Sequence, residues 1–126
     1  MPRIEKIQKH ALQIVFNDKA SDYDELLHRA GTCSVETRWK RQLATEVYKA
    51  VNGLTPPYIS NMFEQKTVQY NLRATKVITQ PKFHTQTHGY HSLRNEGTRL
   101  WATLPNSCKN AKDINAFKRL VVNYIK

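Results

Sequence analysis

The chain has 126 residues, of which 40% are hydrophobic and 24% charged, and its formal net charge is +10. This composition fits one globular domain or a fragment of one, and it excludes a multidomain enzyme, a collagen-like chain and a low-complexity chain. Apolar runs are much shorter than the roughly 20 residues of a membrane span and no signal peptide is apparent, so we expect an intracellular protein without a membrane partner, with nucleus and cytoplasm both open.

Two helices are expected before residue 32. The first covers residues 3–16, because apolar residues recur there at helical spacing. Its stripe consists of Ile4, Ile7, Ala11, Ile14 and Val15. Ser21 and Asp24 resemble a capping box at the start of a second helix, and Gly31 is a typical left-handed end.

A third and longer helix is expected after Ser34, which is a good N-cap residue. Its apolar positions are four residues apart, at Val35, Trp39, Leu43, Val47 and Val51. Asn52-Gly53 should end it, and Pro56-Pro57 then favours a short helix through Phe63.

The helical period disappears between residues 64 and 91, where we expect an irregular, partly extended segment. Residues 65–95 contain no acidic side chain. Lys and Arg alternate there with aromatic residues, which is typical of surfaces that bind unpaired nucleic acid.

Helical patterns return over residues 92–126 and predict a C-terminal helical pair. Its first stripe is Leu93, Gly97, Leu100, Trp101 and Leu104. Asp113 is expected to cap the second helix, with Ile114, Phe117, Leu120, Val121, Tyr124 and Ile125 facing inward. The expected fold is therefore mainly α, with about five to six helices in a single domain or fragment. It consists of a helical half at 1–63, a basic segment at 64–91 and the C-terminal helical pair at 92–126.

The positive charge is concentrated in the second half of the chain. Residues 64–126 have a net charge of +8, against +2 for residues 1–63. Such a balance favours polyanions, because neutralised phosphates release counterions. We expect phosphate contacts from Lys66, Arg73, Lys76, Lys82, Arg94 and Arg99, and base stacking on Tyr70, Phe83 and Tyr90. The alternative is a solvated basic surface whose aromatic side chains belong to the core.

Motifs for catalysis are absent from the sequence. It has no clustered glycines for a phosphate loop and no Gly-x-Ser-x-Gly elbow. The acids between Asp18 and Glu25 fit a helix N-terminus better than a metal site. Three histidines, His84, His88 and His91, have a spacing that zinc can use, but Pro81 and Gly89 oppose a helix there, and no cysteine or carboxylate completes the set. We expect no metal, no cofactor and reduced thiols at Cys33 and Cys108.

A series of landmarks runs along nearly the whole chain, in this order: 3–9, 11–12, 14–18, Tyr23 with 25–27, 43–54, 56–58, 70–73, 81–83, Gly89-Tyr90, Ser92, Arg94, Gly97, Leu100-Trp101, 104–107 and 116–120. In this order they resemble the tail that follows the reverse transcriptase domain in polyproteins of jockey-like non-LTR (LINE-type) retrotransposons. The resemblance implies a parent that is an RNA-directed DNA polymerase. It implies that this chain is a truncated C-terminal region, helping to hold RNA or target DNA.

The resemblance carries over no catalytic residue, because the chain has no Asp-Asp pair to hold the polymerase metal ions. The chain also departs from the family where basic residues are usual, at His10, Gln13 and His91. We therefore expect a non-catalytic accessory region that binds RNA or single-stranded DNA without strong sequence preference. Two alternatives are a protein-interaction fragment that docks on the upstream reverse transcriptase domain, and a truncated element copy with no independent function.

Overall fold

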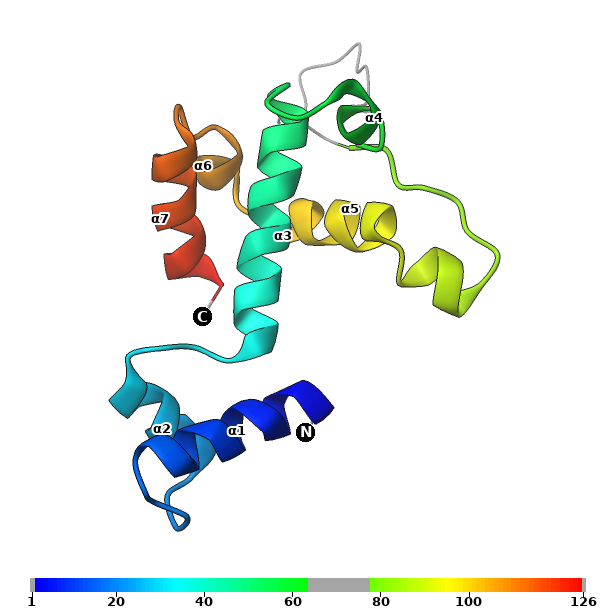
Figure 1. The fold of residues 1–126 in the computed structure, drawn as a ribbon. Coiled ribbons are helices and arrows are strands. Elements are labelled where there is room, and N and C mark those ends of the chain that lie inside the picture. The colour runs from blue at the N-terminus through cyan, green and yellow to red at the C-terminus, as the bar shows by residue number, and fades with distance from the viewer. Residues whose placement is uncertain (1, 64–77, 126) are drawn as a thin grey trace. The chain divides into compact units, whose positions relative to one another are not determined.

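The computed structural model describes residues 2–63 and 78–125, and over these residues the chain is mainly helical, as predicted (Figure 1). Its elements are α1 (Arg3–Val15), α2 (Tyr23–Ala30), α3 (Val35–Val51), α4 (Pro57–Ser60), the π-helix η1 (Gln86–Tyr90), α5 (Leu93–Thr103), α6 (Asn106–Lys109) and α7 (Ile114–Tyr124). The described residues form more helices than the expected five to six, because α6 and η1 are too short to leave a periodic pattern. No helix in the described ranges is long and apolar enough to cross a membrane.

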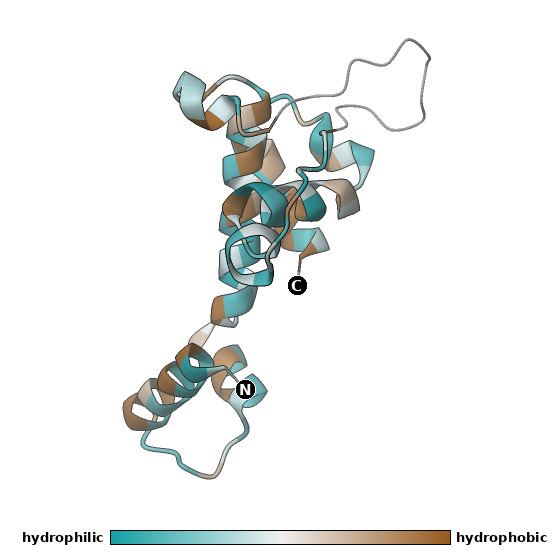
Figure 2. Ribbon diagram, turned by 90° about the vertical axis from the view of Figure 1, so that its right-hand side faces the viewer, coloured by the Kyte–Doolittle hydropathy of each residue, from teal (hydrophilic) through white to brown (hydrophobic). Residues whose placement is uncertain are grey.

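The chain divides into two compact units. The N-terminal unit comprises Met1–Lys40 and the C-terminal unit comprises Arg41–Ile125. The long helix α3 begins in the first unit and continues in the second. Hydrophobic and hydrophilic positions alternate along the helices of both units, as amphipathic packing requires (Figure 2).

The N-terminal unit is held together by polar contacts as much as by its small core. Glu5 of α1 is only 6% exposed and accepts hydrogen bonds from the Tyr23 hydroxyl and from the amides of Val35 (3.3 Å) and Glu36 (2.9 Å). The bond from Tyr23 is the main cause of a lowered Glu5 pKa. Because the first amides of α3 have no intrahelical acceptor, Glu5 acts as a cap supplied by another helix. Ser34 also caps α3 as predicted, accepting from the Thr37 amide at 3.2 Å.

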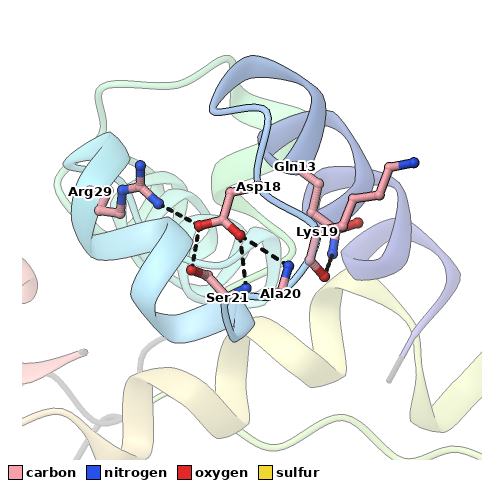
Figure 3. Close-up of polar contacts among 6 residues, drawn as sticks. All are labelled: Gln13, Asp18, Lys19, Ala20, Ser21 and Arg29. Carbon is pink, nitrogen blue, oxygen red and sulfur yellow. Dashed lines mark hydrogen bonds and ion pairs between the residues drawn. The ribbon is translucent and has the colours of Figure 1, made fainter.

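Asp18 organises the turn between α1 and α2 (Figure 3). Its carboxylate accepts from the Ser21 hydroxyl (2.5 Å), the amides of Ala20 (3.0 Å) and Ser21 (3.1 Å), and the Arg29 guanidinium (2.9 Å). The capping box predicted at Ser21 is therefore wrong: the N-cap residue of α2 is Asp22, which makes no side-chain cap bond. Ser21 bonds to Asp18 because the acid precedes it by three residues and can form a tighter local turn. Gly31 ends α2 in the left-handed conformation, as predicted.

The core of the C-terminal unit is built around α3, α5, α6 and α7. Phe117 of α7 is fully buried between two aromatic rings, with centroids 4.3 Å from Tyr48 and 6.2 Å from Trp101. Gly97 allows α5 to approach this core closely. A Cβ atom there would lie 2.7 Å from the Phe63 ring and 2.9 Å from a Val47 methyl group. The Cys108 thiol is buried in the same core, and burial raises its pKa.

Several predicted core positions lie at the surface instead. Trp39, Leu93 and Tyr124 are each about half exposed, and Leu120 is exposed by 36%. The apolar stripes of these helices are wider than the faces that the helices bury against the core. The Tyr124 hydroxyl, for example, donates to the Thr103 carbonyl at 2.7 Å, which keeps the ring at the edge of the core.

The predicted irregular segment is partly helical. Residues 64–77 lie outside the described part of the chain. Ile78 is buried and forms an isolated bridge, and residues 79–85 are irregular. The π-helix over Gln86–Tyr90 corrects the expectation that no helix forms near His84 and His88. Gly89 lies within this π-helix, where a Cβ atom would lie 2.4 Å from the Phe83 Cβ.

Candidate nucleic-acid interface

The C-terminal unit carries most of the positive charge. Arg41–Ile125 contains twelve Lys and Arg against four Asp and Glu, a net of +8, whereas Met1–Lys40 contains seven against six. An anionic partner is therefore attracted mainly to the C-terminal unit.

Buried hydrogen bonds fix the segment that precedes α5. Asn95 is completely buried, and its side-chain amide donates to the Tyr90 carbonyl at 2.5 Å and accepts from the Gln80 side chain at 2.9 Å. Ser92 caps α5 by accepting from the Asn95 amide at 3.3 Å, and its hydroxyl donates to the Gly89 carbonyl at 2.7 Å. These bonds tie residues 80–92 to the first turn of α5, so the side chains they carry have defined positions.

Tyr90 contacts both Phe83 and Arg99, and we call these three residues the aromatic–arginine cluster. The Phe83 and Tyr90 rings meet edge to face, with centroids 5.6 Å apart and planes at 72°. The Arg99 guanidinium carbon lies 4.4 Å from the Tyr90 centroid. Gly89 makes the arrangement possible, because a Cβ atom at this position would lie 2.4 Å from the Phe83 Cβ.

The exposure of the cluster suits contact with a ligand. Phe83 is 39% exposed and Arg99 is exposed, whereas Tyr90 is half-buried between them. An aromatic ring at the surface beside a cation combines a stacking face for a base with a partner for the neighbouring phosphate.

One acidic side chain reduces the charge of the cluster. Glu96 Oε1 lies 3.7 Å from an Arg99 nitrogen and 3.4 Å from His91 Nδ1. Exposed ion pairs of this kind contribute about 0–1 kcal/mol, so a phosphate can compete for Arg99 at low cost.

The structure brings together three of the nine predicted site residues, those of the aromatic–arginine cluster. Lys82 is exposed next to Phe83 and forms no ion pair with a described residue. Arg94 and Arg99 are five positions apart on α5, about 140° around the helix, so they do not share a face. Arg94 is half-buried, and its Nε is buried without a hydrogen-bond acceptor. The remaining predicted residues, Lys66, Tyr70, Arg73 and Lys76, lie outside the described ranges.

Sequence reasoning missed the residues that position the cluster. Asn95 and Gln80 belong to no recognisable sequence motif, and their hydrogen bond forms only in the folded chain. The Ser92-x-x-Asn95 spacing is a capping signal that indicates a fixed N-terminus for α5. Three further cations, Lys112, Lys118 and Arg119, are exposed at and before α7 and form no ion pair with described residues.

The three histidines whose spacing could suit zinc, His84, His88 and His91, are all exposed. In the described part of the chain, no group of three or more His, Cys, Asp or Glu side chains is arranged to hold a metal ion. His91 instead contacts Glu96 and lies edge-on to the Tyr90 ring, with centroids 5.0 Å apart.

In comparisons with known proteins, the chain matches no protein-family model, no curated protein and no solved structure.

Proposed function

We propose that this chain is a non-catalytic, basic accessory region that binds RNA or single-stranded DNA without strong sequence preference. The observation that carries the proposal is the position of Arg99 over the Tyr90 ring, which also contacts the exposed ring of Phe83, in a unit with a net charge of +8. Cations bind the phosphate backbone of any sequence, and an aromatic face stacks on any base. Phosphate contacts are available on any strand, but the two contacts are available together only where bases are unpaired.

The origin of the chain is a further part of this proposal. The order of landmarks from Arg3 to Leu120 supports descent from the C-terminal tail of a jockey-like retrotransposon polyprotein. In that setting, the polymerase chemistry belongs to the upstream domain and this region contributes affinity for the template or target strand.

The proposal is tested by fluorescence anisotropy of a labelled single-stranded RNA, titrated with the full chain at several salt concentrations. We expect affinity of order micromolar at low salt and a log–log salt slope of several units, because each phosphate contact on a single strand contributes about 0.7. A duplex of the same length should bind more weakly. Affinity that does not change with salt would contradict the proposal.

Matched variants separate the proposed interface from total charge. The double variant Lys82→Gln/Arg99→Gln removes two positive charges from the C-terminal unit and should weaken binding. Lys9→Gln/Lys19→Gln removes two charges from the N-terminal unit and should leave the affinity within about twofold. Equal losses in both would mean that net charge alone drives binding.

The absence of catalysis is tested separately. Incubating the chain with labelled RNA and DNA, with and without a divalent metal ion, should give no cleavage. A metal-dependent product that persists through purification would overturn this part of the proposal.

A further inference from the structure

The N-terminal helix exposes an apolar face that its own unit does not use. Ile4 is 60% exposed, Ile7 69%, Ile14 67% and Val15 73%. With the exposed Ala11, they form one stripe along the whole length of α1. Monomeric proteins rarely leave a contiguous row of this kind in water, so the stripe is a candidate contact surface.

The opposite side of α1 makes the contacts within the N-terminal unit. Glu5 is buried there against the Tyr23 hydroxyl and the first amides of α3, and Gln8 Oε1 lies 3.0 Å from the same hydroxyl oxygen. Among the described residues of this unit, Tyr23, Leu26 and Leu27 are the buried hydrophobic ones, so these residues expose more large apolar side chains than they bury. Units of about 40 residues usually need such additional burial for stability.

A basic row borders the stripe. Arg3 lies one helical turn before Ile7, and His10 lies one turn before Ile14, with Lys6 between them on the same side. All three are exposed, whereas the single acid of α1, Glu5, is buried on the other side. This edge of the stripe is therefore positive and favours a partner that is apolar at its centre and acidic at the edge that meets this row.

Among the residues that the structure describes, a second copy of this chain offers no comparable row of exposed apolar side chains flanked by acids. Apart from α1 and Trp39, the large apolar residues that the described residues expose are all in the C-terminal unit, whose net charge is +8. The exposed acids of the N-terminal unit, such as Asp22, Asp24 and Glu25, have no exposed large apolar residue in α2 beside them.

We propose that the α1 stripe is a docking face for an amphipathic helix of another protein, whose aliphatic stripe is flanked by Asp or Glu. Two helices pack stably when apolar rows interdigitate, and charges at the edges then select the partner. This inference does not depend on the proposed nucleic-acid binding, because it concerns residues of the other unit.

The test uses the full chain and two labelled synthetic helical peptides. Both carry leucine at the a and d positions of three heptads. One carries glutamate at the e and g positions and the other lysine, so they differ only in flanking charge and each repels its own copies. We expect the glutamate peptide to bind at least tenfold more tightly in fluorescence anisotropy. Equal binding of the two peptides, or no binding, would overturn the proposal.

Matched variants of the chain locate the site. Ile7→Glu/Ile14→Glu should reduce affinity for the glutamate peptide at least tenfold, while circular dichroism shows that helix content is retained. Lys19→Glu makes the same change of −2 in net charge away from the stripe and should have little effect. An unchanged affinity in the isoleucine variant would contradict the assignment.

Two other occupants give distinct results, and each would overturn the proposal. Concentration-dependent self-association in sedimentation velocity, abolished by Ile7→Glu/Ile14→Glu, would identify a second copy as the occupant. Co-flotation with phosphatidylserine vesicles, abolished by the same variant while the glutamate peptide fails to bind, would identify a lipid surface.

Discussion

The guanidinium carbon of Arg99 lies 4.4 Å from the centroid of the Tyr90 ring. The two residues come from different elements, α5 and η1, and the buried Asn95 side chain of α5 ties these elements together by its bond to the Tyr90 carbonyl. The guanidinium lies over the ring that Phe83 also contacts, and the cation–π contact favours this side-chain conformation before a phosphate binds.

Replacing Arg99 by glutamine should weaken binding of single-stranded RNA and reduce the log–log salt slope by about 0.7, because one phosphate contact is lost. Fluorescence anisotropy at four or more salt concentrations measures both quantities. Lys19→Gln is the matched loss of one charge in the N-terminal unit. A slope that is the same in Arg99→Gln and wild type would exclude Arg99 from the interface.

Phe83→Leu should weaken binding to single strands about 5- to 100-fold, since base stacking on an aromatic residue contributes about 1–3 kcal/mol. Leucine retains an apolar contact with Gly89 and Tyr90 but has no flat face. The affinity for duplex should change much less, and Phe83→Trp should restore single-strand binding. Competition experiments with both kinds of strand give the ratio of single-strand to duplex affinity. An equal loss of affinity for duplex and single strand would argue against stacking.

Gly97→Ala should lower the free energy of unfolding of the C-terminal unit by about 1–3 kcal/mol, the usual cost of overpacking. The added methyl group would lie 2.7 Å from the Phe63 ring and 2.9 Å from Val47, and both are held in the core. Urea denaturation followed by tryptophan fluorescence in a Trp39→Phe background, where Trp101 is the remaining tryptophan, measures the change. The control is Asn123→Ala at an exposed site of α7, where no such loss is expected. Equal stability of Gly97→Ala and wild type would show that α5 can shift away from α3.

The carboxyl group of Asp18 should titrate with a pKa of about 2, mainly because the Ser21 hydroxyl donates to its charged form, with further bonds from two amides and Arg29. Since the folded-state pKa lies below the ordinary value of 3.8, the stabilisation is present above about pH 4 and is lost as the pH falls through 2. Carbon-detected NMR titration measures the pKa directly. Ser21→Ala should move it towards 3.8, and an unshifted pKa in that variant would exclude the hydroxyl as the main cause.

Local patterns predicted the helices well wherever their signals were strong. The first helix ends within one residue of the expected position, and Gly31 and Ser34 end and begin their helices as expected. These signals succeed because a left-handed glycine or a capping hydroxyl acts within one turn of the chain. The mainly α class follows from such local signals alone.

Tertiary partners were not predictable in the same way. An amphipathic pattern shows that a helix has an apolar face but not whether another element covers it, so the stripe of α1 gave no sign of being exposed. The Ser21 hydroxyl donates to Asp18, three residues earlier, instead of capping α2. Glu5 caps α3 from 30 residues away, a distance at which no local pattern indicates the contact. At the candidate interface, the sequence suggested Phe83, Tyr90 and Arg99 from composition, but not the Asn95 and Gln80 contacts that position them.

The most direct test of the central proposal is an amide NMR titration of the full chain with a short single-stranded RNA. We expect the largest shift changes at Lys82, Phe83, Tyr90 and Arg99, with little change over residues 2–38, and we expect the changes to disappear as salt is raised. Shift changes concentrated in α1 and α2, or none at low salt, would contradict the assignment of nucleic-acid binding to the C-terminal unit.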